Sequence, residues 1–368
     1  MSRAKPNGTA APALGGKAAP VVITGGSGFI GCNLAESFLR DGEDVVVVDD
    51  LSRPGVVQNL EWLKSDFGEK VHPIVADIRE LEAIRPAFLQ AKAVFHLAAQ
   101  TAVTTSLDDP VGDFEVNARG TLNVLEAVRA SGRTVPVIFA STNKVYGALD
   151  DLEMIELEDR YIPASIEIRQ NGIGEDRRLD FCTPYGCSKG VADQYVLDYA
   201  KSFGIPTTVL RMSCIYGPHQ FGTEDQGWVA HFLIRALQGE PVSIYGNGKQ
   251  VRDVLHVADA VAAYRAVLAG IGEVSGQTFN LGGGVHNAVS LRMVLQEIRR
   301  VTGAEPATQW SEWRPGDQYY FVADTARLQN KLGWTAKIGW RDGLRNLADW
   351  LREMRGLGRT QQQERLTA

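Results

Sequence analysis

The residues best suited to chemistry are Tyr185 and Lys189, in the segment CTPYGCSKG. A spacing of four places both side chains on one face of an α-helix, which Thr183 is suited to cap and Pro184 to begin. A phenol titrates near pH ~10, and a cation about 4 Å away lowers that value by at most about 3 pH units at an effective dielectric of roughly 20. Lys189 could therefore make Tyr185 a general base near neutral pH. The same spacing also occurs in ordinary surface pairs, so the pair needs support from elsewhere in the chain.

A glycine-rich turn near the N-terminus gives that support. The β-branched run VVIT, Val21–Thr24, predicts a buried strand, and it leads into GGSGFIG and then into helix-type residues. The glycines fit G-x-x-G-x-x-G (Gly25, Gly28, Gly31) or, starting from Gly26, G-x-G-x-x-G. Glycine lets the chain turn tightly and lets backbone approach a pyrophosphate, while the helix N-terminus offers N–H groups. The order strand, glycine turn, helix therefore predicts a dinucleotide site.

Acidic residues follow the next two predicted strands. Asp49 lies in VVVVDD, about 20 residues beyond the glycines, where a carboxylate would bind the adenosine ribose hydroxyls. This favours NAD over NADP, because a 2′-phosphate would meet the carboxylate, although Arg53 nearby could accept that phosphate. Asp49 could also be a simple turn residue at a strand end. Asp77 follows the strand predicted at 71–76 and is placed to face the adenine.

Strands and helices alternate from Val21 to Thr142, which predicts a doubly wound parallel Rossmann sheet of the α/β class. Ligands then bind beyond the carboxyl ends of the strands, where Asp49, Asp77 and the small Ala98 gather. Further predicted elements are helices at 56–67, 80–89, 108–130 and 185–203, and strands at 45–50, 93–100, 136–142 and 206–213.

The chain divides into two predicted domains. Residues 20–215 form the main part of the NAD-binding Rossmann domain, and residues 216–355 form most of a smaller mixed α/β substrate-binding domain, with some segments returning to the sheet. Residues 148–182 are acidic and weakly periodic, and are expected to be an insertion over the cleft or a long loop. We expect a disordered leader at 1–19 and a disordered tail at 356–368.

Composition excludes several classes of function. The net charge of −6 argues against non-specific binding of nucleic acid, and no apolar run approaches the ~20 residues of a membrane helix. The four cysteines form no C-x-x-C pair, which favours free thiols in a reducing compartment, so we expect a cytoplasmic protein. The six histidines show no metal-ligand spacing, so no metal site is expected.

The motifs TGGSGFIG, DIRE, HLAAQ, STNKVYG, PYGCSK and RDVLHV together resemble the extended short-chain dehydrogenase/reductases, and among them the nucleotide-sugar epimerase and dehydratase group. The resemblance covers about Val21 to Trp350 and implies tightly held NAD, with Tyr185 and Lys189 as a catalytic pair and Thr142 as their partner. The cofactor contacts that it implies are Gly25, Gly28, Phe29, Ile30, Gly31, Asp49, Asp50, Asp77, Ile78, Leu97, Ala98, Ala99, Asn117, Tyr185 and Lys189.

Within that group, residues at a few positions indicate which subfamily the chain resembles. A 4,6-dehydratase carries Asp-Glu directly after the threonine, whereas this chain has Asn143 and Lys144, which disfavours elimination of water. A typical 4-epimerase has Asn after the strand of Arg211, whereas this chain has Ser213 and Cys214. The strings LDFCTPYGCSKGVADQYVLDYA, YGPHQFGTEDQGWV and GNGKQVRDVLH, and the length of the insertion, are similar to the CDP-paratose (CDP-tyvelose) 2-epimerases.

This resemblance implies a reaction in which Tyr185 takes the proton of the hydroxyl at carbon 2 of a CDP-hexose and NAD accepts the hydride. The resulting keto sugar turns its other face, and the hydride returns. Arg252 and Arg314 are candidates to bind the diphosphate, although either could be an ordinary ion-pair arginine. The remaining candidates near the sugar or base are Asn143, Met212, Ser213, His219, Gln226 and Trp228.

Two other hypotheses remain open. One is another nucleotide-sugar enzyme on the same scaffold, such as a 4-epimerase, a decarboxylase or a net reductase. The other is a non-catalytic NAD-sensing protein, which the fold also allows. Isotope tracing distinguishes an epimerase from a decarboxylase or a net reductase, because an epimerase returns the substrate's own hydride. By analogy with the family, we also expect a homodimer.

Overall fold

The computed structural model describes residues 19–303, 306–314 and 316–354. Apart from residue 19, the predicted leader and tail lie outside the described residues. Among the described residues, no helix combines the length and the apolar character needed to cross a membrane.

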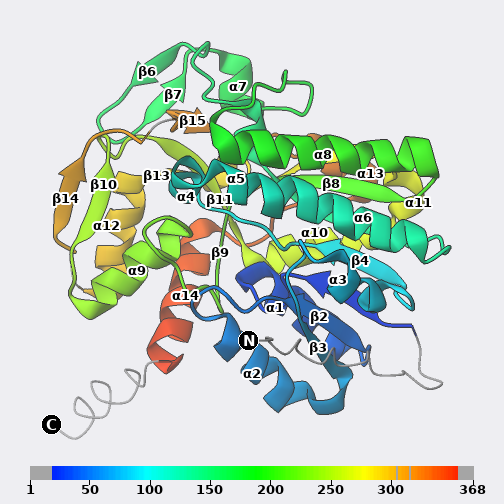
Figure 1. The fold of residues 1–368 in the computed structure, drawn as a ribbon. Coiled ribbons are helices and arrows are strands. Elements are labelled where there is room, and N and C mark those ends of the chain that lie inside the picture. The colour runs from blue at the N-terminus through cyan, green and yellow to red at the C-terminus, as the bar shows by residue number, and fades with distance from the viewer. Residues whose placement is uncertain (1–18, 304–305, 315, 355–368) are drawn as a thin grey trace, which may run out of the picture.

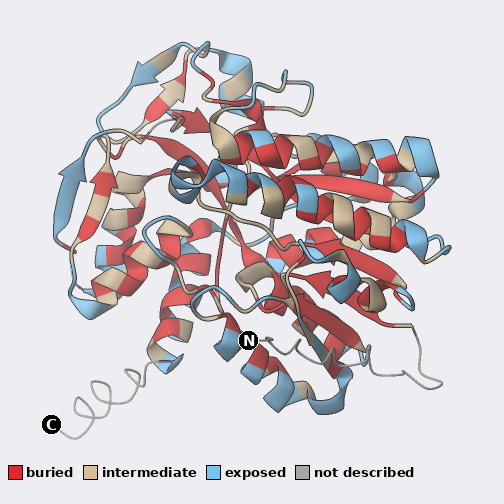
Figure 2. Ribbon diagram, viewed as in Figure 1, coloured by how far each residue is buried: buried red, intermediate tan, exposed pale blue. Residues whose placement is uncertain are grey.

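A seven-stranded parallel sheet forms the centre of the molecule, in the order β12-β8-β5-β4-β1-β2-β3 (Figure 1). This confirms the predicted doubly wound α/β fold. Because both faces of such a sheet are covered, its central strands are continuous apolar runs and are buried along their length (Figure 2). The strands are β1 Val21–Thr24, β2 Val45–Asp49, β3 Val71–Val75, β4 Ala93–His96, β5 Val137–Thr142, β8 Thr207–Met212 and β12 Gln277–Leu281.

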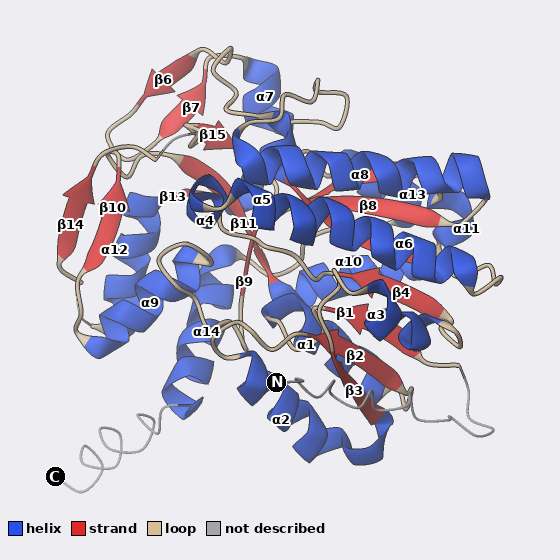
Figure 3. Ribbon diagram, in the orientation of Figure 1, coloured by secondary structure: helices blue, strands red, loops and turns tan. Residues whose placement is uncertain are grey.

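Helices cover both faces of this sheet (Figure 3). One apolar cluster joins the sheet to α1 (Phe29–Arg40), α2 (Val56–Phe67) and α10 (Val257–Ala269). A second cluster joins the opposite face to α3 (Leu81–Phe88), α6 (Gly120–Ala130) and α8 (Thr183–Phe203). The shorter α11 (Ile271–Val274) and α13 (Ala326–Leu332) pack near the β12 edge.

The rest of the C-terminal half forms a smaller mixed α/β unit around a third apolar cluster. β12 does not belong to this unit, because it pairs with β8 in the main sheet. The helices of the unit are α9 (Trp228–Gln238), α12 (Leu291–Thr302) and α14 (Trp340–Met354). Its strands are β9 (Cys214–Tyr216), β10 (Val242–Tyr245), β11 (Val251–His256), β13 (Ala288–Ser290), β14 (Thr308–Ser311) and β15 (Tyr320–Phe321).

The insertion at 148–182 is structured, so the expectation of a long loop was wrong. It contains the antiparallel strands β6 (Met154–Glu156) and β7 (Tyr161–Pro163) and the helix α7 (Ile166–Asn171). Ile173 bridges to Ala323 and packs with Phe321, near the other end of the chain. None of its residues lines the cavity described below, so it does not cover the cleft either.

Two predicted elements have different bounds. The single helix expected at 108–130 is divided into α4 (Val103–Asp108), α5 (Pro110–Phe114), a π-helical turn (Glu115–Arg119) and α6. Asp109 caps α5 as its sequence position predicts, since its carboxylate accepts the N–H of Gly112 at 2.9 Å. The strand expected at 93–100 ends at His96, and the following residues line the cavity instead.

Candidate active site

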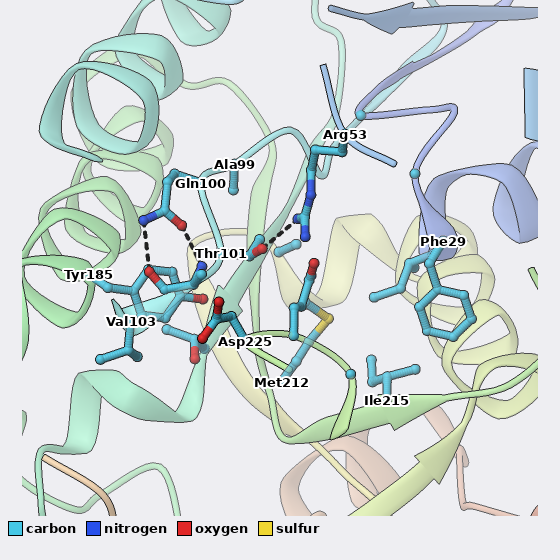
Figure 4. A pocket seen from close by; sticks show the side chains of 18 of the residues that line it. Phe29, Arg53, Ala99, Gln100, Thr101, Val103, Tyr185, Met212, Ile215 and Asp225 are labelled. Carbon is cyan, nitrogen blue, oxygen red and sulfur yellow. Dashed lines mark hydrogen bonds between the residues drawn. The ribbon is translucent and has the colours of Figure 1, made fainter. Parts of the chain in front are cut away.

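One cavity of about 830 Å³ extends from the carboxyl ends of the sheet strands to the C-terminal unit. Its size lies in the range of small-molecule sites. Figure 4 shows side chains from several elements around it, with Phe29 on one side of the view, Tyr185 on the other and Met212 between them. Among the described residues, no group of His, Cys, Asp and Glu side chains could hold a metal ion.

The glycine turn packs directly beneath the first helix. Gly25 has φ +67°, and a Cβ built at Gly31 would lie 2.1 Å from the carbonyl oxygen of Gly25. Helix α1 can therefore approach the turn only with glycine at position 31. Its N-cap, Gly28, makes no side-chain capping bond, and Gly28, Phe29 and Gly31 all line the cavity. The N-terminus of α1 thus offers backbone N–H groups to an anion, which fits a dinucleotide pyrophosphate.

Carboxylates line the cavity after β2 and β3. The two carboxylate oxygens of Asp49 accept the N–H groups of Ser27 and Leu51, each at 3.0 Å, which fixes the side chain toward the glycine turn. Burial nevertheless raises the pKa of Asp49. Asp77 is paired with Arg79 at 2.6 Å, and this hydrogen bond lowers the pKa of Asp77. Asp49 therefore lines the cavity beside the glycine turn, and its binding of ribose hydroxyls stays a prediction.

Arg53 also lines the cavity and lies close enough to Asp49 to be affected by its charge. Its guanidinium donates a hydrogen bond to the hydroxyl of Thr101 at 2.6 Å (Figure 4). Desolvation lowers the pKa of Arg53, and the carboxylates of Asp49 and Asp50 act in the opposite direction. Arg53 is thus held near the predicted cofactor site by Thr101.

Helix α8 carries Tyr185 to the cavity wall. The helix begins at Thr183, with Pro184 in its first turn, and the Thr183 hydroxyl accepts the N–H of Gly186 at 3.4 Å. Further along, Asp193 forms a buried bidentate pair with Arg211 of β8, with both distances 2.9 Å. This pair fixes α8 against the sheet, so the position of Tyr185 depends on it.

The protonation of Tyr185 differs from the sequence expectation. Its side chain is buried, and desolvation raises its pKa to about 12. A hydrogen bond with Thr142 and the charge of Arg53 both lower this pKa, but burial has the larger effect. The lowering expected from Lys189 was wrong for this structure, because burial cannot be read from a spacing of four residues.

Lys189 lies behind the cavity wall. Its ammonium donates to the carbonyl oxygen of Ala140 at 2.6 Å and lies 4.1 Å from the centre of the Phe139 ring. Burial lowers its pKa to about 7. Asn117 is also behind the wall: its amide oxygen accepts the N–H of Gln100 at 3.0 Å, and its amide nitrogen donates to Ser188. Of the residues expected to contact the cofactor, these two do not line the cavity, whereas the others do.

The positions that carry acids in a dehydratase hold neutral or basic side chains here. The amide nitrogen of Asn143 donates to Gln318 at 3.0 Å. The ammonium of Lys144 donates to the carbonyl of Gly316 at 3.2 Å and lies 3.7 Å from Asp317. Asn143 and Lys144 both line the cavity. Neither can act as the carboxylate of an elimination reaction.

The two candidate arginines lie at the C-terminal side of the cavity. Arg252 forms an ion pair with Asp317 at 2.6 Å, and Arg314 lies 3.5 Å from Asp225. Both arginines line the cavity, so their guanidinium groups can reach a ligand there. The remaining candidates that line it are Met212, Ser213, Gln226 and Trp228.

His219 does not fit its expected place. Its ring stacks on Trp62 at 3.8 Å between centres and lies near Trp350, and His219 is not among the residues that line the cavity, although the next residue, Gln220, is. The sequence expectation that it faces the sugar or base was therefore wrong. An aromatic stack between remote segments leaves no periodic signal in the chain.

Several cavity residues were missed from the sequence. Gln100 and Thr101 follow the end of β4, and Glu224, Ser243 and Tyr245 lie at the far end. The alternation in VSIY, the sequence of β10, could have indicated the last two, because Val242 and Ile244 are buried apolar residues on the other side of the strand.

Comparisons with known proteins agree with this geometry. Residues 21–282 match the model of the NAD dependent epimerase/dehydratase family. The chain is 42% identical over 337 residues to CDP-paratose 2-epimerase of Salmonella typhi, covering 90% of this chain and 98% of that protein.

Solved structures are similar as well. UDP-glucose 4-epimerase of Thermotoga maritima with UDP-glucose has a TM-score of 0.77 at 29% identity, covering 91% of this chain and 99% of that one. UDP-glucose 4-epimerase of Thermus thermophilus in complex with NAD has a TM-score of 0.75 at 31% identity, covering 90% and 99%. The chain belongs to the NAD dependent epimerase/dehydratase family.

Proposed function

We propose that this protein is a nucleotide-sugar epimerase that inverts carbon 2 of a CDP-linked hexose. The observation that carries the proposal is that Tyr185 and Thr142 line the same cavity as the glycine turn of Gly25 to Gly31. The similarity to a CDP-paratose 2-epimerase along 98% of that protein supports the choice of sugar nucleotide and carbon.

The cofactor is NAD, as in the family to which the chain belongs. When bound, NAD supplies an acceptor for the hydride of the sugar carbon and later a donor of the same hydride. The N-terminus of α1 would hold its pyrophosphate, and Asp49 would hold the adenosine ribose. Lys189, which does not line the cavity, would support the site from one helical turn beyond Tyr185, where it fixes the carbonyl of Ala140.

The chain's own residues move one proton. Tyr185, as phenolate, takes the proton of the hydroxyl at carbon 2, and Thr142 shares its hydrogen bond. After the keto sugar has turned its other face, the phenol of Tyr185 returns the proton to the carbonyl oxygen. Asn143 and Lys144 contain no carboxylate, so no water is eliminated in between. Arg252 and Arg314 would bind the diphosphate and hold the nucleotide during that rotation.

Proton NMR of the sugar tests the proposal. Purified protein is incubated with CDP-paratose, CDP-tyvelose and UDP-glucose, and inversion at carbon 2 of the CDP-sugars is expected without consumption of added NADH. Inversion of UDP-glucose at carbon 4 instead would favour the 4-epimerase alternative. Conversion of a CDP-sugar to another product with matching reduction of added NAD would favour a net oxidoreductase. No turnover of any of these sugars, none of which carries a carboxylate, would favour a decarboxylase or an NAD sensor.

The Tyr185→Phe variant separates catalysis from cofactor binding. It should lose turnover by about 10²-fold or more, because it has no proton to exchange, while the purified protein still contains NAD. Tyr195→Phe is the matched control, since Tyr195 lies on the same helix and is 45% exposed. Full activity in Tyr185→Phe would remove Tyr185 from the mechanism.

We also propose that the protein is a cytoplasmic homodimer that pairs through α4, α5 and α8. These helices pack together and expose large apolar side chains, namely Leu107, Val111, Phe114 and Tyr195. A second copy of the chain would cover them and remove apolar surface from water. Light scattering should then give about twice the chain mass of 40.1 kDa, and Val111→Asp should give the monomer.

A further inference from the structure

The far end of the cavity is built by a strand with two different sides. In β10, Val242 and Ile244 are completely buried in the apolar cluster of the C-terminal unit, whereas Ser243 and Tyr245 line the cavity. This follows from the two-residue period of a strand, since VSIY alternates apolar and hydroxyl-bearing side chains. The strand thus places two hydroxyl groups on the cavity side.

A carboxylate from another element meets these hydroxyls. Glu224 precedes α9, lines the cavity and accepts a hydrogen bond from the Tyr245 hydroxyl at 2.5 Å. This bond is the main reason that the pKa of Glu224 is lowered, and the Ser243 hydroxyl adds a second bond. Glu224 is therefore ionised at neutral pH, and an ionised carboxylate can only accept hydrogen bonds.

The arginines show which part of a ligand reaches Glu224. The guanidinium of Arg314 lies 3.9 Å from the centre of the Tyr245 ring and 3.9 Å from the Glu224 carboxylate. If Arg252 and Arg314 bind the diphosphate, as proposed above, the sugar extends from it toward Tyr185. The nucleoside then extends the other way, toward β10, and Glu224 lies beside the base.

We propose that Glu224 selects the base of the sugar nucleotide, by accepting a hydrogen bond from the exocyclic amino group of cytosine. This inference rests on the proposed function for the class of ligand. At the same ring position uracil and thymine carry a keto oxygen, which is an acceptor. A carboxylate facing that oxygen leaves two acceptors opposed and unpaired, which weakens binding. Pairing of glutamate with the amino group of cytosine is a recognised mode of base discrimination.

The test measures binding of the nucleoside diphosphates without any sugar. Isothermal titration of the NAD-loaded protein gives Kd values for CDP and UDP in the wild type, in Glu224→Gln and in Asp225→Asn. We expect the wild type to bind CDP about 10- to 100-fold more tightly than UDP. In Glu224→Gln the ratio should fall to within about threefold, because an amide can also donate to the keto oxygen.

Asp225→Asn is the matched control. Asp225 is the next residue, lines the same cavity and lies 3.5 Å from Arg314, so its neutralisation should change the affinities for CDP and UDP by the same factor and preserve their ratio. Equal wild-type affinities for CDP and UDP would overturn the inference, and so would a Glu224→Gln variant that keeps the wild-type ratio. A protein that discriminates CDP from UDP through Glu224 but epimerises no CDP-sugar would contradict the proposed function alone.

Discussion

At the scale of single residues, the proposed chemistry depends on a phenol whose surroundings keep it neutral. Burial raises the pKa of Tyr185 to about 12, while the hydrogen bond with Thr142 and the charge of Arg53 act in the opposite direction. A base with a raised pKa is mostly protonated at neutral pH, so its active fraction increases about tenfold with each unit that the pH rises toward that pKa. The rate of epimerisation should therefore rise from neutral to alkaline pH.

The Thr142→Val variant tests how the Thr142 hydroxyl affects the pKa of Tyr185 and the pH dependence of the rate. Valine has nearly the same shape but no hydroxyl, so the pKa of Tyr185 should rise further and the alkaline rise in rate should move to higher pH. A hydrogen bond to a charged group contributes about 1.5–3 kcal/mol, which corresponds to a rate about 10- to 100-fold lower at pH ~7.5. Initial rates by NMR between pH ~6 and ~10 measure the profile.

Thr142→Ser is the control for that profile, because it keeps the hydroxyl and should follow the wild type. If Thr142→Val also kept the wild-type profile, the Thr142 hydroxyl would have no role in the ionisation of Tyr185. Loss of NAD from the variant would be a separate effect, and the cofactor content of the purified protein distinguishes it.

The types of the reactive residues were predictable from sequence, but their environments were not. The motifs around Tyr185, Thr142 and the glycine turn identified residues that do line one cavity. The spacing of Tyr185 and Lys189 suggested direct electrostatic contact, whereas Lys189 bonds to Ala140 and is separated from the cavity. Burial is a property of the whole packed chain, so a local pattern cannot reveal which effect controls a pKa.

At the scale of elements, the close approach of α1 to the glycine turn shapes the proposed cofactor site. Gly31→Ala should disrupt it, because the added Cβ would lie 2.1 Å from the carbonyl oxygen of Gly25 and the helix must shift. We expect loss of bound NAD and a lower melting temperature. Thermal unfolding measures the melting temperature, and the ultraviolet absorbance of the purified protein measures the bound NAD.

Gly272→Ala is the matched control for that substitution. Gly272 lies in α11, and no atom lies within 4 Å of the Cβ that alanine would add. Alanine is also the better helix former, by up to about 1 kcal/mol, so this variant should be as stable as the wild type or slightly more so. NAD retained at the wild-type level in Gly31→Ala would contradict the role given to this approach.

A second prediction at this scale concerns the buried ion pair that attaches α8 to the sheet. Arg211 and Asp193 are buried side chains that form a bidentate pair, and Ser141 also donates to Asp193. Arg211→Met leaves a buried carboxylate without its cation, which should cost about 3–5 kcal/mol in the free energy of unfolding. Urea unfolding followed by circular dichroism measures this cost.

Arg40→Met provides the comparison on the surface. Arg40 pairs with Glu36 at 2.5 Å on α1, but its side chain is 66% exposed, so its removal should cost far less stability than removal of Arg211. Similar costs for Arg211→Met and Arg40→Met would show that the buried pair does not fix α8 on the sheet.

The elements themselves were predicted where the pattern was strong. The β-branched runs of β1 and β2 and the helix at Val56–Phe67 lie where the sequence placed them. The failures have physical causes. The π-helical turn at Glu115–Arg119 has no distinct periodicity, and residues 148–182 are ordered by a bridge from Ile173 to Ala323, a partner 150 residues away.

At the scale of the whole molecule, the cavity lies between two parts of the chain with different tasks. The central sheet and its covering helices supply the glycine turn, Asp49 and Tyr185, whereas the C-terminal unit supplies Arg252 and Arg314. The fold class could be predicted because strands and helices alternate regularly. The contact between β10 and Glu224 could not be predicted, because contacts between remote loops and short strands depend on tertiary packing.

The central claim is that a hydride leaves the sugar carbon and returns to it within this one cavity. CDP-paratose that carries deuterium at carbon 2 tests this in ordinary water, with the positional label followed by NMR and mass spectrometry. The account predicts CDP-tyvelose that retains the deuterium at carbon 2, with no exchange with solvent and no net use of added NADH. Replacement of that deuterium by solvent hydrogen during inversion would contradict the account, because it would show proton abstraction at carbon instead of hydride transfer.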